Sequence, residues 1–350
     1  MRGSSAIVVT FLFILVSCTF MISVQSDDEQ SFADSPTNII NIHYDDYFVS
    51  LFDDNTARVG QYSGDETSVV IPSVIDYLDR TYTVTCIVSS AFSHNTNIQS
   101  VVIPNTIEEI WSGAFAGCTS LKDITIPASV TTIGREAFSG CINLESVSIE
   151  GSVSILNSTF EGCTSLFDVS INSVDEMVRT FRNCTSLSNT DFLSNVGTLS
   201  SYVFEGCVSI KSMDLTGVNL SDYSLSRCTG LESVILPSDM DAIPSGLFYS
   251  SSIRSIEIPS GVTSIGTFAF SQCTSLESVF LPAGLTTIGS GAFSYCSIND
   301  IELPSSLGTI EDRVFMGSSI EHITIPDSVT SIGDYCFAEC SSLTDVDFPE

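Results

Sequence analysis

The chain has 350 residues, of which 42 are acidic and 11 are basic, and its formal net charge at pH 7 is −31. This balance argues against nucleic acid as a partner, because binding to phosphate needs clustered lysine and arginine. It is also not the composition of a disordered acidic tail, since 43% of the residues are hydrophobic and only 15% are charged.

The first 26 residues have the features of an export signal. Arg2 supplies a positive start, residues 6–24 are mostly apolar, and small residues before Asp27 predict cleavage after Ser26. Two alternatives stay open: an uncleaved membrane anchor, because the apolar stretch is 19 residues long, and a lipid attached to Cys18. All three place the rest of the chain outside the cytoplasm, as a secreted or cell-surface protein.

Residues 27–41 are polar and acidic, and we expect them to form a flexible leader. In residues 42–85, apolar and polar residues alternate, with turn signals at residues 53–55 and 63–65. This pattern predicts strands and hairpins. We expect a β-rich N-terminal cap here, because the end units of a stacked array are atypical.

From residue 86 to residue 350 the chain repeats one short unit. Its apolar key position returns every 21 to 23 residues, at Phe92, Phe115, Phe138, Phe160, Phe181, Phe204, Leu225, Phe248, Phe270, Phe293, Phe315 and Phe337. A unit this short cannot bury its own apolar face. We therefore predict a solenoid of about twelve coils, each stacked on its neighbours.

One full copy runs from Ala114 to Gly134. Ile124 and Ile126 have the spacing of a strand with one buried face, and Pro127 ends that strand because it cannot donate to a ladder. A second short extended segment is expected at residues 130–133, and Gly134 is expected to allow a sharp return. We expect one turn of α- or 3₁₀-helix around Phe115.

Two parts of the array depart from this pattern. Between about residues 150 and 230 the Ile-Pro and Ile-Gly pairs are lost, which predicts a local irregularity. The last copy stops at residues 348–350 without a polar capping segment. We expect either that the natural chain continues or that another molecule covers this end.

The repeat Ala-Phe-x-x-Cys-x-x-Leu-x-x-Val-x-Ile-Pro-x-x-Val-x-x-Ile-Gly resembles the leucine-rich repeat of BspA type, which occurs in exported proteins of microbes. The resemblance covers residues 84–350. It implies a curved leucine-rich-repeat solenoid at the cell surface that serves in adhesion or in binding other macromolecules. It brings no catalytic residue and no cofactor to this chain.

Nine of the twelve cysteines lie three residues after the key position: Cys118, Cys141, Cys163, Cys184, Cys207, Cys228, Cys273, Cys296 and Cys340. Coils about 4.8 Å apart would permit disulfides between neighbours. The alternative is that cysteine fills a small inward slot as a free thiol. We favour thiols, because equivalent side chains in a ladder point in parallel. No metal site is expected, since only Cys336 and Cys340 approach a ligand spacing.

The sequence offers little catalytic chemistry. It has no nucleophile elbow, phosphate-binding loop or zinc-type His-Glu-x-x-His motif. Only His94 and Cys86 form a near pair of base and nucleophile, and an enzyme is therefore the least favoured function. Three asparagines match the glycosylation acceptor and would be used only in a host that glycosylates: Asn157, Asn183 and Asn219.

The residue between the two inward aliphatics of each strand should point outward. We call this slot the outward column: Val102, Thr125, Ser148, Ser170, Asp191, Asp214, Ile235, Glu257, Phe280, Glu302, Thr324 and Asp347. Columns beside it add Phe167, Lys211, Arg254 and His322.

The outward column changes character along the chain, from small residues to acidic residues with two apolar ones. We predict a ligand strip formed by Ile235, Glu257, Phe280, Glu302 and Arg254, with a protein or a glycan as the partner. The alternative function is a structural envelope or matrix component that assembles with copies of itself. We expect no cofactor, and contact with a membrane only through the N-terminal segment.

Overall fold

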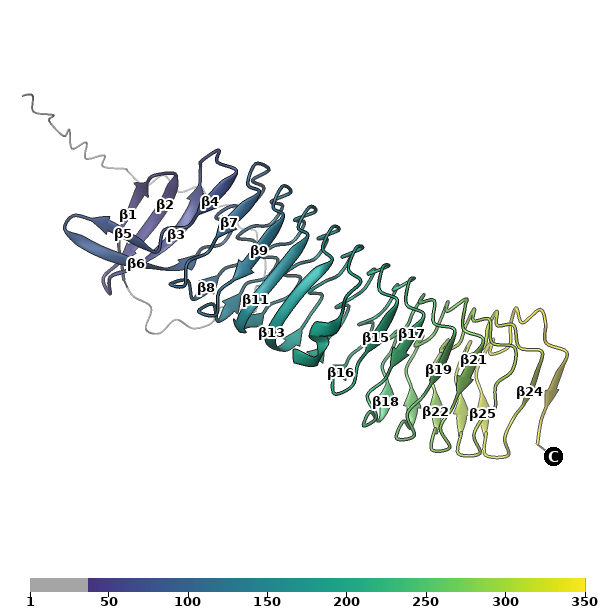
Figure 1. Ribbon diagram of the computed structural model, residues 1–350. Coiled ribbons are helices and arrows are strands. Elements are labelled where there is room, and N and C mark those ends of the chain that lie inside the picture. The colour runs from purple at the N-terminus through teal and green to yellow at the C-terminus, as the bar shows by residue number, and fades with distance from the viewer. Residues whose placement is uncertain (1–36, 350) are drawn as a thin grey trace, which may run out of the picture. The chain divides into compact units, whose positions relative to one another are not determined.

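The computed structural model describes residues 37–349 (Figure 1). The predicted export signal, the alternatives for Cys18 and most of the predicted leader lie outside these residues. Within them, no helix is long and apolar enough to cross a membrane.

The segment predicted as a β-rich cap consists of strands, and the first of them starts at Asn38, slightly earlier than expected. They are β1 (Asn38–Tyr44), β2 (Tyr47–Phe52), β3 (Thr56–Tyr62), β4 (Ser68–Val70), β5 (Val74–Tyr77) and β6 (Arg80–Ile87). Strands β1, β2 and β3 are antiparallel neighbours, and β5 and β6 form a hairpin. Strand β4 already pairs in parallel with the first strand of the repeats, so the solenoid begins before the first repeat phenylalanine.

The repeats stack as a solenoid in which most coils contribute two short parallel strands. The first face of the coils carries β7 (Ser100–Val102), β9 (Asp123–Ile126), β11 (Ser146–Ser152), β13 (Asp168–Met177), β15 (Ser212–Asp214), β17 (Ser233–Ile235), β19 (Ser255–Glu257), β21 (Ser278–Phe280), β24 (His322–Thr324) and β26 (Asp345–Asp347). The predicted β-rich solenoid is confirmed.

The second face carries β8 (Glu109–Ile110), β10 (Thr132–Ile133), β12 (Ser154–Ile155), β14 (Val196–Leu199), β16 (Asn219–Leu220), β18 (Ala242–Ile243), β20 (Ser264–Ile265), β22 (Thr287–Ile288), β23 (Thr309–Ile310) and β25 (Ser331–Ile332). Eight of these strands end on a buried aliphatic residue, while Leu220 and Ile332 at the ends of β16 and β25 are half-buried. Where β13 crosses to this face, Met177 is buried.

The core is a set of columns that run along the solenoid. The repeat phenylalanine rings stack on one another from coil to coil, with centroids 5.1 Å apart between Phe115 and Phe138 and 5.9 Å apart between Phe293 and Phe315. Leu225 interrupts this stack between Phe204 and Phe248 and is itself fully buried. Only Phe337, in the last coil, is less than fully buried. The inward register predicted from the repeat is therefore correct.

The segment around the repeat phenylalanine is not the helical turn that we expected. In each coil the residues two before and two after this position have positive φ, as at Glu136 (55°) and Gly140 (70°) on either side of Phe138. A left-handed residue ends a helical turn, because an L-amino-acid helix needs negative φ throughout. The chain instead makes two successive tight turns. Among the described residues the only helix is the 3₁₀-helix η1 (Asp191–Asn195).

Gly134 has a different role from the sharp return that we predicted. A Cβ placed on it would lie 2.4 Å from the backbone nitrogen of Ser112 in the previous coil. The glycine of the Ile-Gly pair is therefore required because two backbones approach closely there. Gly266 and Gly333 show the same approach to their preceding coils.

The coils depart from the regular pattern between residues 168 and 199. Strand β13 has 10 residues and bends from the first face to the second, pairing first with β11 and then with β14. In the next coil η1 replaces the first-face strand, so Asp191, which we assigned to the outward column, lies in this helix. Phe192 of η1 fills the core, 5.5 Å from Phe181 and 6.4 Å from Phe204 between ring centroids.

Candidate binding surface

The structure exposes the outward column on the first face of the coils. Every predicted member is solvent exposed except Ser148, which is half-buried, while the residues on either side of each member point inward in most coils. In coils with paired strands the members lie directly opposite one another, as in the pairs Val70–Val102, Asp214–Ile235 and Thr324–Asp347. Val70 of β4 thus extends the column by one position that the sequence did not reveal.

The two apolar residues of the predicted strip lie on this face with most of their surface in solvent. Ile235 is 59% exposed and Phe280 is 68% exposed. Glu257 of β19 pairs directly with Phe280 of β21, so an acid and an aromatic ring lie side by side. β17 and β19 are not joined by a strand ladder, and Ile235 is therefore near this pair without being in strict register with it.

The remaining two residues of the predicted strip are also exposed. Glu302 has the repeat position that we assigned, but its coil has no regular strand there. Arg254 lies just before β19, and neither it nor Glu257 forms an ion pair within residues 37–349. Lys211, in the column of Arg254, instead pairs with Glu232 at 3.6 Å. The strip thus offers one free cation beside free carboxylates and two apolar side chains.

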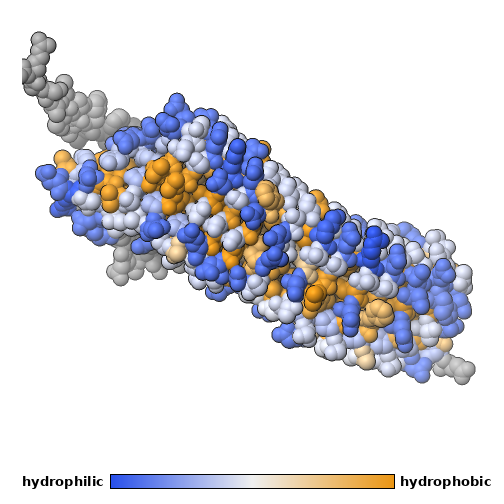
Figure 2. Space-filling model, in the orientation of Figure 1, coloured by the Kyte–Doolittle hydropathy of each residue, from blue (hydrophilic) through white to orange (hydrophobic). Residues whose placement is uncertain are grey.

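Figure 2 shows how hydropathy is distributed over the side of the molecule seen in Figure 1. Hydrophobic residues follow the middle of the visible face along the stack of coils, and hydrophilic residues border them on both sides.

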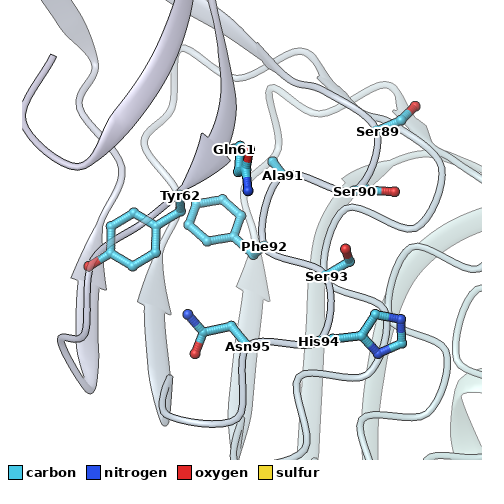
Figure 3. Close-up of a pocket in the computed structure, with 9 residues that line it drawn as sticks. All are labelled: Gln61, Tyr62, Ser89, Ser90, Ala91, Phe92, Ser93, His94 and Asn95. Carbon is cyan, nitrogen blue, oxygen red and sulfur yellow. The ribbon is translucent and has the colours of Figure 1, made fainter. Parts of the chain in front are cut away.

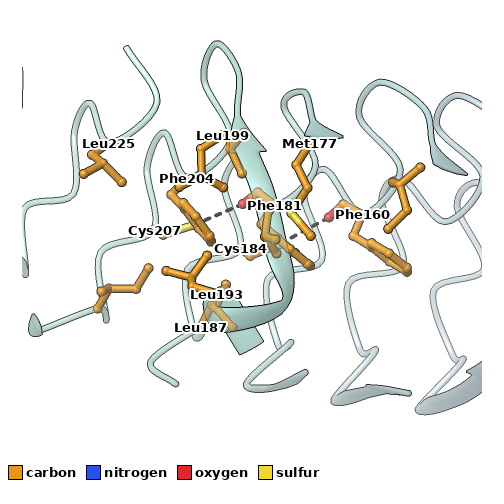
Figure 4. Packing of buried hydrophobic residues seen from close by; sticks show 14 of the residues in the cluster. Phe160, Met177, Phe181, Cys184, Leu187, Leu193, Leu199, Phe204, Cys207 and Leu225 are labelled. Atoms are coloured by element: carbon orange, nitrogen blue, oxygen red, sulfur yellow. Dashed lines mark hydrogen bonds between the residues drawn. The ribbon is translucent and has the colours of Figure 1, made fainter. Parts of the chain in front are cut away.

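The cysteine column lies inside the solenoid. The eleven cysteines within residues 37–349 are free thiols, and all but Cys340 are buried. Each of the nine repeat cysteines donates a hydrogen bond from its Sγ to the carbonyl oxygen of the key position in the preceding coil. Figure 4 shows two of these bonds, from Cys184 to Phe160 at 3.2 Å and from Cys207 to Phe181 at 3.1 Å.

Burial lowers the chemical reactivity of these thiols. Loss of solvation raises the pKa of Cys163 to about 12 and that of Cys228 to about 12. The thiolate is the reactive form of cysteine, so thiols held in the protonated state make poor nucleophiles and poor metal ligands. The column serves packing and hydrogen bonding between coils.

A shallow pocket of about 450 Å³ lies where the last residues of β3 meet the first repeat (Figure 3). Residues 61–62 and 89–95 line it, and the rings of Tyr62 and Phe92 face one another at one side, with centroids 5.3 Å apart. His94 lines the pocket but points away from these rings (Figure 3). Cys86 is buried on β6 and does not line it, so the structure does not assemble the pair considered for catalysis.

The three glycosylation acceptors differ in access. Asn183 and Asn219 are exposed, and Asn183 occupies a left-handed turn position with a φ of 60°. Asn157 is half-buried and its Oδ1 accepts a hydrogen bond from Ser158, 2.8 Å away. Asn183 and Asn219 therefore fit a modification better than Asn157 does, and their use stays a prediction.

One cluster of side chains is not among the site residues predicted from the sequence. His322 and Asp345 occupy the same repeat position in neighbouring coils, and Asp347 lies two residues further along its strand. Aligning the last two copies of the repeat would have placed these three side chains together.

The sequence matches the family model of the BspA type leucine rich repeat region in six copies, over residues 85–211, 177–277 and 263–350. A leucine rich cell surface protein from Faecalibacterium prausnitzii A2-165 is 28% identical, with a TM-score of 0.62 over 91% of this chain and 96% of that protein. A leucine-rich repeat protein from Bacteroides ovatus ATCC 8483 is 26% identical, with a TM-score of 0.61 over 87% and 94% of the two chains. No curated protein gave a significant match.

Proposed function

The chain belongs to the BspA-type leucine-rich repeat family, and from this premise we propose that it is an exported binding protein. Its repeats would act outside the cell, either released or held at the surface. The partner is a protein or a glycan, bound on the first face of the coils around Ile235, Glu257 and Phe280. Glu302 and Arg254 would border this contact.

The observation that carries the proposal is the exposure of Phe280 and Ile235 in a column that elsewhere holds mostly serine, threonine and acidic residues. Aromatic side chains contribute most of the contact energy at many interfaces, while charges at the rim steer the approach of the partner. Arg254 and Glu257 have no ion-pair partner within residues 37–349, so pairing with a ligand breaks no existing pair.

Two further observations support a role outside the cell. The first is the export signal predicted at residues 1–26. The second is the similarity to the Faecalibacterium protein, which is a cell surface protein. The proposal includes no catalytic step, because all thiols of the repeat column except Cys340 are buried, and burial raises the pKa of Cys163 and of Cys228.

The test begins with the purified chain and a panel of immobilised glycans and extracellular proteins. The proposal expects saturable binding to at least one class of ligand, together with monomeric sedimentation of the free protein. Sedimentation as a growing, concentration-dependent series of oligomers, without a saturable ligand, would instead support the self-assembling envelope component. Digestion of the repeats by protease added to intact cells tests their location, and full protection of the repeats would contradict it.

A further inference from the structure

His322, Asp345 and Asp347 converge on the first face of the last two coils. Strands β24 and β26 are parallel, and their register places His322 opposite Asp345 and Thr324 opposite Asp347. Each nitrogen of the imidazole approaches one of the two carboxylates. Its Nδ1 is 3.8 Å from Oδ2 of Asp345, and its Nε2 is 3.5 Å from Oδ2 of Asp347.

This convergence is not a general consequence of an acidic chain. The sequence has 42 acidic residues and 12 cysteines, yet within residues 37–349 only these three residues bring three potential ligand atoms within 4.8 Å of one another. Most first-face strands begin instead with serine, as β15, β17, β19 and β21 do. The strand ladder fixes the two backbones, so the side chains stay neighbours without an ion.

We propose that His322, Asp345 and Asp347 bind a divalent transition-metal cation, with Zn²⁺ as the best match. An imidazole nitrogen and carboxylate oxygens are ligand types that zinc binds in proteins. Imidazole also favours Zn²⁺ over Ca²⁺ and Mg²⁺, which prefer ligand sets made of oxygen alone.

The spacing of the ligand atoms fits a shared ion. Zinc binds nitrogen and oxygen at about 2.0 to 2.2 Å, so ligand atoms around one ion lie about 3 to 3.5 Å apart. The 3.5 Å between Nε2 of His322 and Oδ2 of Asp347 is already at this spacing. All three side chains are exposed, and one potential ligand atom from each lies within 4.8 Å of the other two, so side-chain rotation alone would be needed to bring them to one ion.

The electrostatic setting favours a cation at this place. Glu321 of the same coil as His322, and Asp300 and Glu302 of the coil before it, add further exposed carboxylates. The net charge of −31 also concentrates cations around the whole chain. Three protein ligands leave at least one coordination position facing solvent, where a water molecule completes the shell.

A plain ion pair is the competing interpretation, since a protonated His322 would be attracted to both aspartates. The two interpretations differ in a measurable way. An ion pair needs no metal and gives no saturable uptake of Zn²⁺. The metal site takes up one equivalent of Zn²⁺ at pH 7.5 and depends on each of the three side chains.

The experiment is isothermal titration of the full chain with ZnCl₂ at pH 7.5, in the presence of a non-chelating reductant. The wild-type protein is expected to bind one equivalent. His322→Ala and Asp347→Asn should each weaken that binding at least tenfold, and CaCl₂ should bind more weakly than ZnCl₂.

The matched controls remove the other two histidines within the described residues. His43→Ala and His94→Ala alter exposed histidines far along the chain and should leave the affinity for Zn²⁺ within twofold of wild type. Thermal melting of every variant checks the fold, which these exposed residues should not affect. Unchanged binding by His322→Ala, or an equal loss in His43→Ala, would overturn the proposal.

Discussion

The Sγ atom of Cys184 lies 3.2 Å from the carbonyl oxygen of Phe160, which belongs to the preceding coil. The same oxygen accepts the backbone N–H of Cys163 within its own turn, at 3.2 Å. A carbonyl oxygen has two lone pairs, and here one closes the turn while the other joins two coils. Cysteine suits this slot because it is small, largely apolar and a weak donor.

From the buried thiols of the cysteine column we predict that the folded chain loses stability at alkaline pH. Burial raises the pKa of Cys163 and of Cys228 to about 12, against 9.0 for an ordinary thiol. The unfolded chain therefore releases these protons at lower pH than the folded chain does. The stabilising contribution is complete below pH 9 and is lost as the pH rises from 9 towards 12.

Urea unfolding at pH 8.5 and pH 10.5, with a reductant present, measures this effect. Above pH 9, the unfolding free energy of Cys163→Ala should fall less steeply than that of the wild type, by about 1.4 kcal/mol per pH unit. The reason is that one titrating thiol is removed. Ile149→Val, a conservative change to a buried aliphatic residue that removes no thiol, should leave the pH dependence unchanged. Identical pH dependence in the wild type and Cys163→Ala would refute the explanation.

The phenylalanine stack should supply much of the stability. Phe138→Ala and Phe293→Ala each leave a large void between two stacked rings, and we expect a loss of about 3 to 5 kcal/mol in unfolding free energy. Phe280→Ala is the matched control, since that ring is 68% exposed and its removal should change the stability by less than about 0.5 kcal/mol. Losses below about 1 kcal/mol at both Phe138 and Phe293 would show that the stack is not the main core.

The left-handed turn positions give a separate prediction. Gly140 has a φ of 70°, and an added Cβ would meet no atom closer than 3.9 Å, so the cost of Gly140→Ala is conformational. We expect a loss of about 1 to 2 kcal/mol. Gly140→Asn should cost less, because asparagine tolerates this conformation and Asn183 already adopts it in another coil.

Gly284→Ala is the control for this series. Gly284 has no positive φ and no atom within 4 Å of an added Cβ. The substitution should be neutral or stabilising by up to about 1 kcal/mol, because alanine reduces the freedom of the unfolded chain. Thermal melts of the three variants are sufficient, and equal effects of Gly140→Ala and Gly284→Ala would contradict the proposed role of backbone conformation.

The features set by side-chain periodicity could be predicted from the sequence. The spacing of Phe115 and Phe138 defined the coil, and the Ile-x-Ile alternation placed Ile124 and Ile126 inward with Thr125 outward. The outward column followed from the same register, and the structure places all five residues of the predicted strip in solvent.

The features set by backbone geometry could not be predicted in this way. The two left-handed positions accept glycine, serine, glutamate, arginine and tyrosine in different coils, as at Glu136 and Tyr202, so no residue type marks them. Asp191 fitted the repeat spacing, but its coil packs Phe192 into the core through a 3₁₀-helix instead of a strand. Close backbone contact at Gly134 depends on the neighbouring coil, which a single copy of the repeat does not reveal.

Binding at the strip of Ile235, Glu257 and Phe280 is tested most directly by comparing variants against one ligand from the screen. Ile235→Ser and Phe280→Ala should each raise the dissociation constant at least tenfold, which corresponds to about 1.4 kcal/mol. Val102→Ser is the matched control, because Val102 is an exposed aliphatic residue of the same column in a distant coil. Our proposal predicts wild-type affinity for Val102→Ser, and equal affinities for all three variants would contradict it.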